Sequence, residues 1–244
     1  MFALPMALGI VALLYATVGQ AGGTGYIAVM ALLGLSPDVI KPTALALNVL
    51  VAAIGTVRFA LGGLLTWRSC YPFGILGIPF SVAGGATHLP SSIYQPVVAT
   101  LLLLAAWQMA WSARGAIQSD TKAPLYPPFI QSLMTGAAIG FISGVTGVGG
   151  GIFLAPLVLT FGWANTKQVA AISVVFNLLN SASALIGSYA TFSNLPEALP
   201  VWLAAVGIGG AIGSWIGLRY LSATTLRYLL SLLLFGAGIR MLAF

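Results

Sequence analysis

Two glycine-rich stretches contain residue types that could bind an anion inside a membrane. VGQAGGTG at residues 18–25 and VTGVGGG at residues 145–151 each interrupt a long apolar segment. Glycine allows close backbone approach to a ligand, and a helix that restarts after a break directs its partly positive N-terminal N–H groups at that break. Tight helix packing is the alternative explanation for such glycines. The predicted substrate-binding glycines are Gly22, Gly23, Gly149, Gly150 and Gly151.

Polar side chains near the two breaks complete the predicted anion site. Neutral amides and hydroxyls can replace an anion's hydration shell without holding the anion permanently. Asn177 and Ser181 share one helix face by their i, i+4 spacing, and Asn48 occupies the corresponding position in the first half. Interhelical hydrogen bonds that only hold helices together are the alternative. The predicted polar members of the site are Gln20, Thr24, Asn48, Thr146, Asn177 and Ser181.

Arg58 is the best charged candidate for this site, because it follows an apolar run, NVLVAAIGTV. An ionisable residue within a membrane segment is a functional hypothesis by default, although an arginine near a segment end also anchors at the interface. His88 is expected in a loop or capping role, and Arg240 as an interface anchor. No acid/base pair, catalytic triad or metal-binding motif is evident, so we predict no enzyme, no cofactor and no bound metal.

The composition predicts that the solvent of this chain is a lipid bilayer. Hydrophobic residues make up 59% of the 244 residues and charged residues only 5%, against about 25% charged residues in a soluble domain. The net charge of +6 comes from basic residues scattered at the ends of apolar runs, which is typical of membrane orientation rather than nucleic-acid binding. We predict a multi-pass protein of a bacterial inner (plasma) membrane, with an N-terminal segment that is retained.

The elements that position the candidate residues are apolar segments about 20 residues long, enough to cross a bilayer. Two further regions, 3–34 and 129–163, are apolar but broken by the glycine stretches. Residues 113–128 form the one hydrophilic stretch near the middle of the chain. We therefore predict a first transmembrane repeat at 1–113, a cytoplasmic linker at 114–128 and a second repeat at 129–244. The unbroken segments are expected at 41–62, 71–88, 93–113, 167–189, 199–218 and 224–243.

The two halves resemble each other in the order of their motifs. KPTALALNVL at 41–50 resembles AAISVVFNLL at 170–179, and the two glycine stretches correspond. Chance similarity among apolar helices is the alternative. Placing basic residues inside by the positive-inside rule makes these corresponding segments run in opposite directions, with both termini outside. The predicted fold is an all-α polytopic membrane protein with two inverted-topology repeats and glycine-broken or half-length helices. The basic residues expected inside are Arg58, Arg68, Arg114, Lys122, Lys167, Arg219 and Arg227, and those outside are Lys41 and Arg240.

The second half resembles the TauE/SafE sulfite-exporter family. SGVTGVGGGIFLAPLVLTFGW, AAISVVFNLLNSASALIGSYA and the glycine-rich terminal segment carry the resemblance. Its G-x-G-G-G break is matched by Gly147 and Gly149–Gly151, and its following proline by Pro156. The first half is a looser copy, with GQAGGTG at the break and Met30 or its neighbours near the place of the proline. The resemblance implies a membrane transporter for sulfur-containing anions such as sulfite or organosulfonates, mostly acting as an exporter.

These observations predict a secondary transporter that moves a small anion by alternating access between two halves. A passive anion channel and a membrane assembly subunit that transports nothing are the alternatives. The expected partners are the small anionic substrate and membrane lipid, with no nucleic acid, and a homodimer is left open.

Overall fold

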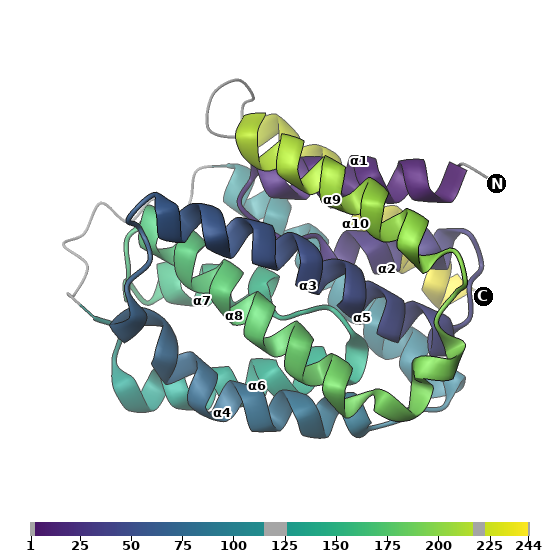
Figure 1. Ribbon diagram of the computed structural model, residues 1–244, viewed down its shortest axis with the longest axis horizontal. Coiled ribbons are helices and arrows are strands. Elements are labelled where there is room, and N and C mark those ends of the chain that lie inside the picture. The colour runs from purple at the N-terminus through teal and green to yellow at the C-terminus, as the bar shows by residue number, and fades with distance from the viewer. Residues whose placement is uncertain (1–2, 115–125, 217–222, 244) are drawn as a thin grey trace.

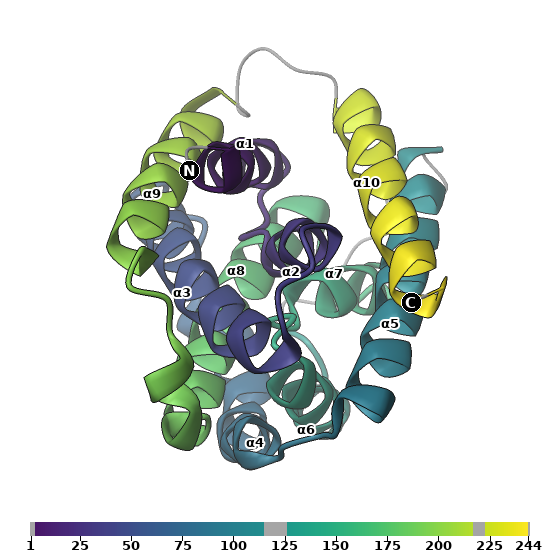
Figure 2. The same ribbon diagram turned by 90° about the vertical axis from the view of Figure 1, so that its right-hand side faces the viewer.

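The computed structural model describes residues 3–114, 126–216 and 223–243, and every regular element in these ranges is helical. Lys122 and Arg219, expected inside, lie outside the described residues, as does most of the predicted linker. Figure 2 shows α2, α7 and α8 near the centre, with the remaining helices around them. The elements of the first half are α1 (Ala3–Thr17), α2 (Gly23–Leu32), α3 (Pro37–Leu61), α4 (Trp67–Ala86) and α5 (Ser91–Ala113). Those of the second half are α6 (Phe129–Thr146), α7 (Gly151–Thr160), α8 (Thr166–Gly187), the 3-10 helix η1 (Tyr189–Asn194), α9 (Leu199–Ile216) and α10 (Ala223–Ala243).

The outer surface has the character of a lipid-facing surface. Within the described residues, five helices are long and apolar enough to cross a bilayer, namely α3, α5, α6, α8 and α9. Trp67, Trp111 and Trp215 are exposed near the ends of their helices, where amphipathic aromatic rings are typical of the membrane interface. The prediction of an all-α, multi-pass membrane protein is confirmed, and the helix bounds agree closely with the apolar segments.

Both broken segments are observed where the glycine stretches predict them. The first break separates α1 from α2 at residues 18–22, and the second separates α6 from α7 at residues 147–150. Each restarted helix has 10 residues, or roughly 15 Å at 1.5 Å per residue, which is about half the thickness of a bilayer core. In Figure 1, α2 and α7 run from the middle of the molecule toward opposite sides. Their N-termini therefore both face the centre.

The packing of the two halves follows a pattern that is largely unchanged when the halves are exchanged. Helix α1 packs along α9, and its counterpart α6 packs along α4. Two further contacts pair counterparts directly, α3 with α8 and α5 with α10, whereas α8 also packs extensively on α4, and the corresponding contact of α3 with α9 is smaller. Such a pattern is expected of two repeats related by a pseudo-two-fold axis, and the inverted relation itself stays a prediction.

Glycines set the close approach of α4 and α6. A Cβ atom at Gly136 would lie 2.2 Å from the carbonyl oxygen of Phe73, and one at Gly140 would lie 2.6 Å from that of Gly77. Small residues at such positions let membrane helices approach backbone to backbone. Along these faces, the alternative explanation of glycine as a packing residue is the correct one.

Replacing Gly136 by alanine is expected to destabilise the protein by about 1–3 kcal/mol, because the added methyl group forces α4 and α6 apart. The matched control is Gly236→Ala in α10, where an added Cβ meets nothing within 4 Å. This control should be neutral or stabilising by up to ~1 kcal/mol, because alanine restricts the unfolded chain. Thermal unfolding in detergent measures both midpoints, and equal midpoints would contradict the packing argument.

The first turn of α1 and the last turn of α10 lie on the same side of the molecule (Figure 1). With the predicted orientation this is the outer side. We expect reporters fused to the N-terminus and to the C-terminus to give the same, non-cytoplasmic signal, as measured with a phosphatase active only outside the cytoplasm. A cytoplasmic C-terminal reporter would contradict the orientation derived from the basic residues.

Lys41, which is expected outside, is buried near the start of α3, with 7% of its surface exposed. Its Nζ donates hydrogen bonds to the carbonyl oxygens of Gly85 at 2.8 Å and Thr87 at 2.9 Å, with that of Gly84 at 3.3 Å. These carbonyls lie at the negative C-terminal end of α4, where a cation is favourable. The side chain therefore caps α4, and this role accounts for a lysine on the side that is predicted to be outside.

Candidate functional site: a pair of glycine-capped half-helices

The N-termini of α2 and α7 are built in the same way. Their N-cap residues, Gly22 and Gly150, have φ angles of 97° and 78°, and neither helix has a side-chain cap. Side chains rarely tolerate this left-handed backbone, which explains glycine at both positions. Because the first N–H groups of a helix have no intrahelical partner, each half-helix presents the positive end of its dipole and first-turn donors without a side-chain cap. In α7 one of them, the Gly151 N–H, donates to the Gly149 carbonyl oxygen at 3.0 Å.

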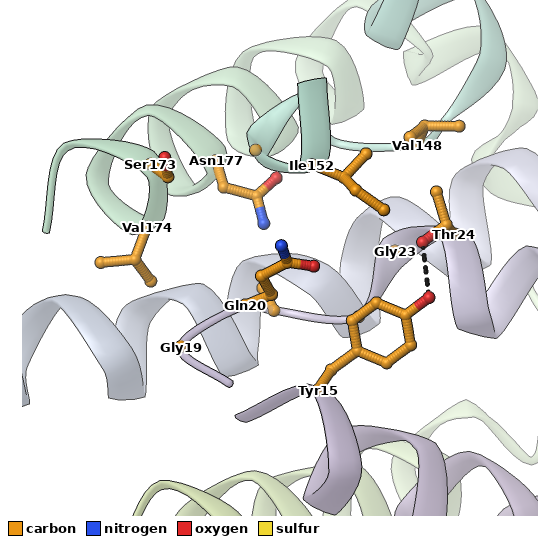
Figure 3. Close-up of a pocket in the computed structure, with 13 residues that line it drawn as sticks. Tyr15, Gly19, Gln20, Gly23, Thr24, Val148, Ile152, Ser173, Val174 and Asn177 are labelled. Carbon is orange, nitrogen blue, oxygen red and sulfur yellow. Dashed lines mark hydrogen bonds between the residues drawn. The ribbon is translucent and has the colours of Figure 1, made fainter. Parts of the chain in front are cut away.

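A small cavity lies against both N-termini (Figure 3). Its volume is about 10 Å³, close to the least that holds one water molecule. An anion needs more room, so binding requires either a widening of this cavity or use of the space beside it. The lining residues are Tyr15, Gly19, Gln20, Ala21, Gly22, Gly23, Thr24, Val148, Gly151, Ile152, Ser173, Val174 and Asn177.

Hydrogen-bonding groups converge on this cavity from both halves. The amide groups of Gln20 and Asn177 point toward one another across it, each with its nitrogen foremost (Figure 3). Facing N–H donors leave room for an acceptor between them. The Ser173 hydroxyl and the side-chain amide oxygen of Gln20, Oε1, are buried and have no hydrogen-bond partner among the described residues. Polar atoms left unpaired in a buried site call for a ligand or water.

Asn48 and Asn177 join the halves directly behind the cavity. Asn48 Nδ2 donates to Asn177 Oδ1 at 3.0 Å and to Ser181 Oγ at 2.7 Å, and Asn177 Nδ2 lies 3.4 Å from Asn48 Oδ1. The backbone of Gly149 lies against this group, because a Cβ there would be 2.0 Å from Asn48 Nδ2. The backbone of Gly23 in turn lies against the second break, since a Cβ added at Gly23 would lie 2.2 Å from the Val148 carbonyl oxygen. The two glycine breaks therefore meet at one place.

The side of the site away from Lys41 contains a larger cavity. It has a volume of about 110 Å³ and shares Gly19, Gln20, Ile152 and Ser173 with the small one. Its far end is lined by Ser112 and Arg227, from the end of α5 and the start of α10. In the predicted orientation this cavity leads inward.

The opposite side of the site is tightly closed. Tyr94 donates its hydroxyl to the carbonyl oxygen of Thr146 at 2.8 Å, and Tyr15 and Thr24 share a hydrogen bond of 2.8 Å. The cavity there, between Lys41 and Tyr94, has a volume of only about 20 Å³. His88 lies exposed at its rim in the α4–α5 connection, as expected. A surface cavity of about 610 Å³ also lies on this side, lined by Pro37 and Ile40 among others, but neither it nor the cavity of about 20 Å³ shares a lining residue with the small cavity.

The structure brings ten of the twelve predicted site residues together and separates two. Arg58 lies on α3 and is not among the residues that line the small or the inner cavity. Thr146 bonds its hydroxyl to Ile142 within its own helix and contributes only its carbonyl to Tyr94. Those brought together are Gln20, Gly22, Gly23, Thr24, Asn48, Gly149, Gly150, Gly151, Asn177 and Ser181.

Three further residues lie in this region that no sequence pattern marks as site residues, namely Tyr15, Gln108 and Arg227. Tyr15 reads as an ordinary apolar-helix residue, and no pattern links it to Thr24 across the break. Gln108 donates from Nε2 to the Ile152 carbonyl at 2.7 Å, near the start of α7. A polar residue within an apolar segment was the available signal for Gln108, whereas Arg227 was interpreted only as an orientation signal.

Comparisons with known proteins agree with this architecture. The family model described as "Sulfite exporter TauE/SafE" matches residues 5–241. The chain is 52% identical over 239 residues to the "Probable membrane transporter protein y4hK" of Sinorhizobium fredii, covering 98% of this chain and 97% of that protein. It is 32% identical over 161 residues to the "Probable membrane transporter protein MJ0441" of Methanocaldococcus jannaschii, covering 64% of this chain and 58% of that protein. No solved structure shows significant similarity. The chain belongs to the sulfite exporter TauE/SafE family of membrane transporters.

Proposed function

We propose that this protein is a secondary transporter that exports a small sulfur-containing anion, such as sulfite or an organosulfonate, across a bacterial inner membrane. The observation that carries the proposal is the meeting of two uncapped, glycine-started half-helices at one cavity. Both dipoles direct their positive ends at it, and neutral donors from Gln20 and Asn177 face it. An anion is the ligand that this arrangement favours.

Among the residues that line the small cavity there is no charged side chain. An anion held only by dipoles and neutral hydrogen bonds can leave again, as transport requires. The site also offers no pair of groups for acid/base chemistry, which favours transport over catalysis. Export of a negative charge by the membrane potential alone gains about 2.3 kcal/mol per 100 mV, so the proposal needs no proton-carrying residue.

Alternating access is supported by the unequal approach from the two sides. The inner cavity of about 110 Å³ shares lining residues with the site, whereas the outer cavities of about 20 Å³ and 610 Å³ share none. A channel would favour a continuous pore, so the closed outer side argues for a transporter. We propose two inverted repeats, 1–113 and 129–244, that rock against each other and are joined by a cytoplasmic linker at 114–128. The packing of helices is similar when the two halves are interchanged, which supports this motion.

The proposal is tested by anion flux into and out of proteoliposomes with an imposed membrane potential. Sulfite, thiosulfate, sulfate and sulfoacetate are the probes, and protein-free liposomes are the control. We expect saturable flux of at least one of these anions, with accelerated exchange when the same anion is present on both sides. Flux that rises linearly without such exchange would establish a channel instead. If no anion moves, the transport proposal is wrong and the assembly-subunit alternative takes its place.

A further inference from the structure

The packed helices α5 and α10 carry polar residues at matching positions. Gln95 and Gln108 on α5 are separated by 13 residues, and the same spacing separates Arg227 and Arg240 on α10. The helices are counterparts in the two halves and pack along each other. Each end of this helix pair therefore carries one glutamine and one arginine, Gln108 with Arg227 and Gln95 with Arg240.

The first pair lies in the inner cavity. Gln108 and Arg227 both line its volume of about 110 Å³. Arg227 is partly buried and donates one hydrogen bond, from a terminal nitrogen to the Ser112 carbonyl at 3.0 Å. The described carboxylates, Asp38 and Glu197, form no ion pair with it. A guanidinium has five N–H donors, so this cation keeps donors for a ligand in the cavity.

The second pair lies at the other end of the two helices. Gln95 and Arg240 line a surface cavity of about 610 Å³, beside the end of α2 and the start of α3. Arg240 donates to the carbonyl oxygen of Leu32, the last residue of α2. Each arginine thus lies beside one of the half-helices, Arg227 beside α7 and Arg240 beside the C-terminal end of α2.

We infer that Arg227 and Arg240 are anion-capture residues, each serving one mouth of the transport path. This inference rests on the proposed function. An arginine in a cavity with low-dielectric walls raises the local concentration of anions, and its fork of donors fits a tetrahedral or pyramidal oxyanion. Captured at Arg227, the anion is passed to the neutral site beside Gln20, which lines both the inner and the small cavity.

The test is sulfite flux in proteoliposomes of known orientation, with entry from each side measured separately. We expect Arg227→Gln to raise the KM for entry from the inner side about tenfold, as for the loss of a charge-assisted hydrogen bond, and to leave the outer-side KM unchanged. Arg240→Gln should do the reverse. The matched control is Arg68→Gln, which removes a cation from the same inner side, where Arg68 lies exposed over the Tyr126 ring; both KM values should stay unchanged.

Unchanged KM values in both variants, or equal changes from both sides, would overturn the inference while leaving transport intact. Absence of sulfite flux in the parent protein would instead count against the proposed function. In that case, anion binding by Arg227 is tested by thermal unfolding of purified protein with and without sulfate. Stabilisation of the parent and Arg68→Gln but not of Arg227→Gln supports the inference, and equal stabilisation of all three overturns it.

Discussion

Replacing Gly149 by alanine is expected to lower anion flux at least about a hundredfold. A Cβ atom at this position would lie 2.0 Å from Asn48 Nδ2, 2.4 Å from Asn177 Oδ1 and 2.9 Å from Ser181 Oγ. The methyl group therefore breaks the hydrogen bonds that join α3 and α8. Each buried group left unsatisfied costs about 1–3 kcal/mol, and the N-terminus of α7 moves off the cavity. Flux in proteoliposomes measures the loss.

The backbone strain of this substitution needs a control of its own, because Gly149 has a φ angle of 87°. Gly63 in the α3–α4 connection also has a positive φ, 65°, but an added Cβ there meets nothing within 4 Å. Gly63→Ala therefore introduces only the strain, about 1–2 kcal/mol, and should keep its flux. Normal flux through Gly149→Ala would remove the second glycine break from the mechanism.

Replacing Asn177 by aspartate is expected to reduce flux by at least about a hundredfold while keeping the shape of the site. The change removes the Nδ2 donor that faces Gln20 across the cavity (Figure 3) and introduces a negative charge next to a negatively charged substrate. At an effective dielectric constant near 20, two unit charges about 4 Å apart repel by roughly 4 kcal/mol. Binding affinity measured by counterflow should fall together with the rate.

The matched control for this charge is Asn180→Asp on the same helix. Asn180 is as buried as Asn177, but its amide donates to Ser143 and it does not line the small cavity. Both variants bear the cost of a buried carboxylate, so their difference reports the effect on the site itself. Equal flux in the two variants would show that Asn177 contacts no substrate and serves only to join the helices.

Much of the fold could be predicted because the bilayer constrains it strongly. Unsatisfied backbone groups are excluded from lipid, so each apolar run is expected to be helical. The glycine stretches at 18–25 and 145–151 are observed as breaks, whereas GIGGAIG at 207–213 stays helical within α9. The pairing of Asn48 with Asn177 followed from the internal repeat, and the structure places these side chains in contact. Repeats and periodicity are local signals, and they are readable in one chain.

The parts that could not be predicted depend on contacts between distant segments. The sequence places Lys41 only as a basic residue outside, because nothing in its own segment shows that it caps α4. Arg58, predicted for the site, lines neither the small nor the inner cavity, because depth along a helix does not reveal which face the side chain occupies. Tyr15 and Arg227 were missed for the same reason. Their neighbours come from helices that are far away in sequence.

The opposed directions of α2 and α7 bear on reversibility. Because both half-helices present the same end to the centre, an exchange of roles between the halves leaves the electrostatic field at the anion nearly unchanged. We therefore expect the intrinsic affinity of the site to be nearly equal whichever mouth is open. A carrier of this kind has no built-in direction, so the concentration gradient and the voltage across the membrane decide which way it runs. Export would then be a consequence of the negative interior of the cell, and a reversed voltage should turn the same molecule into an importer.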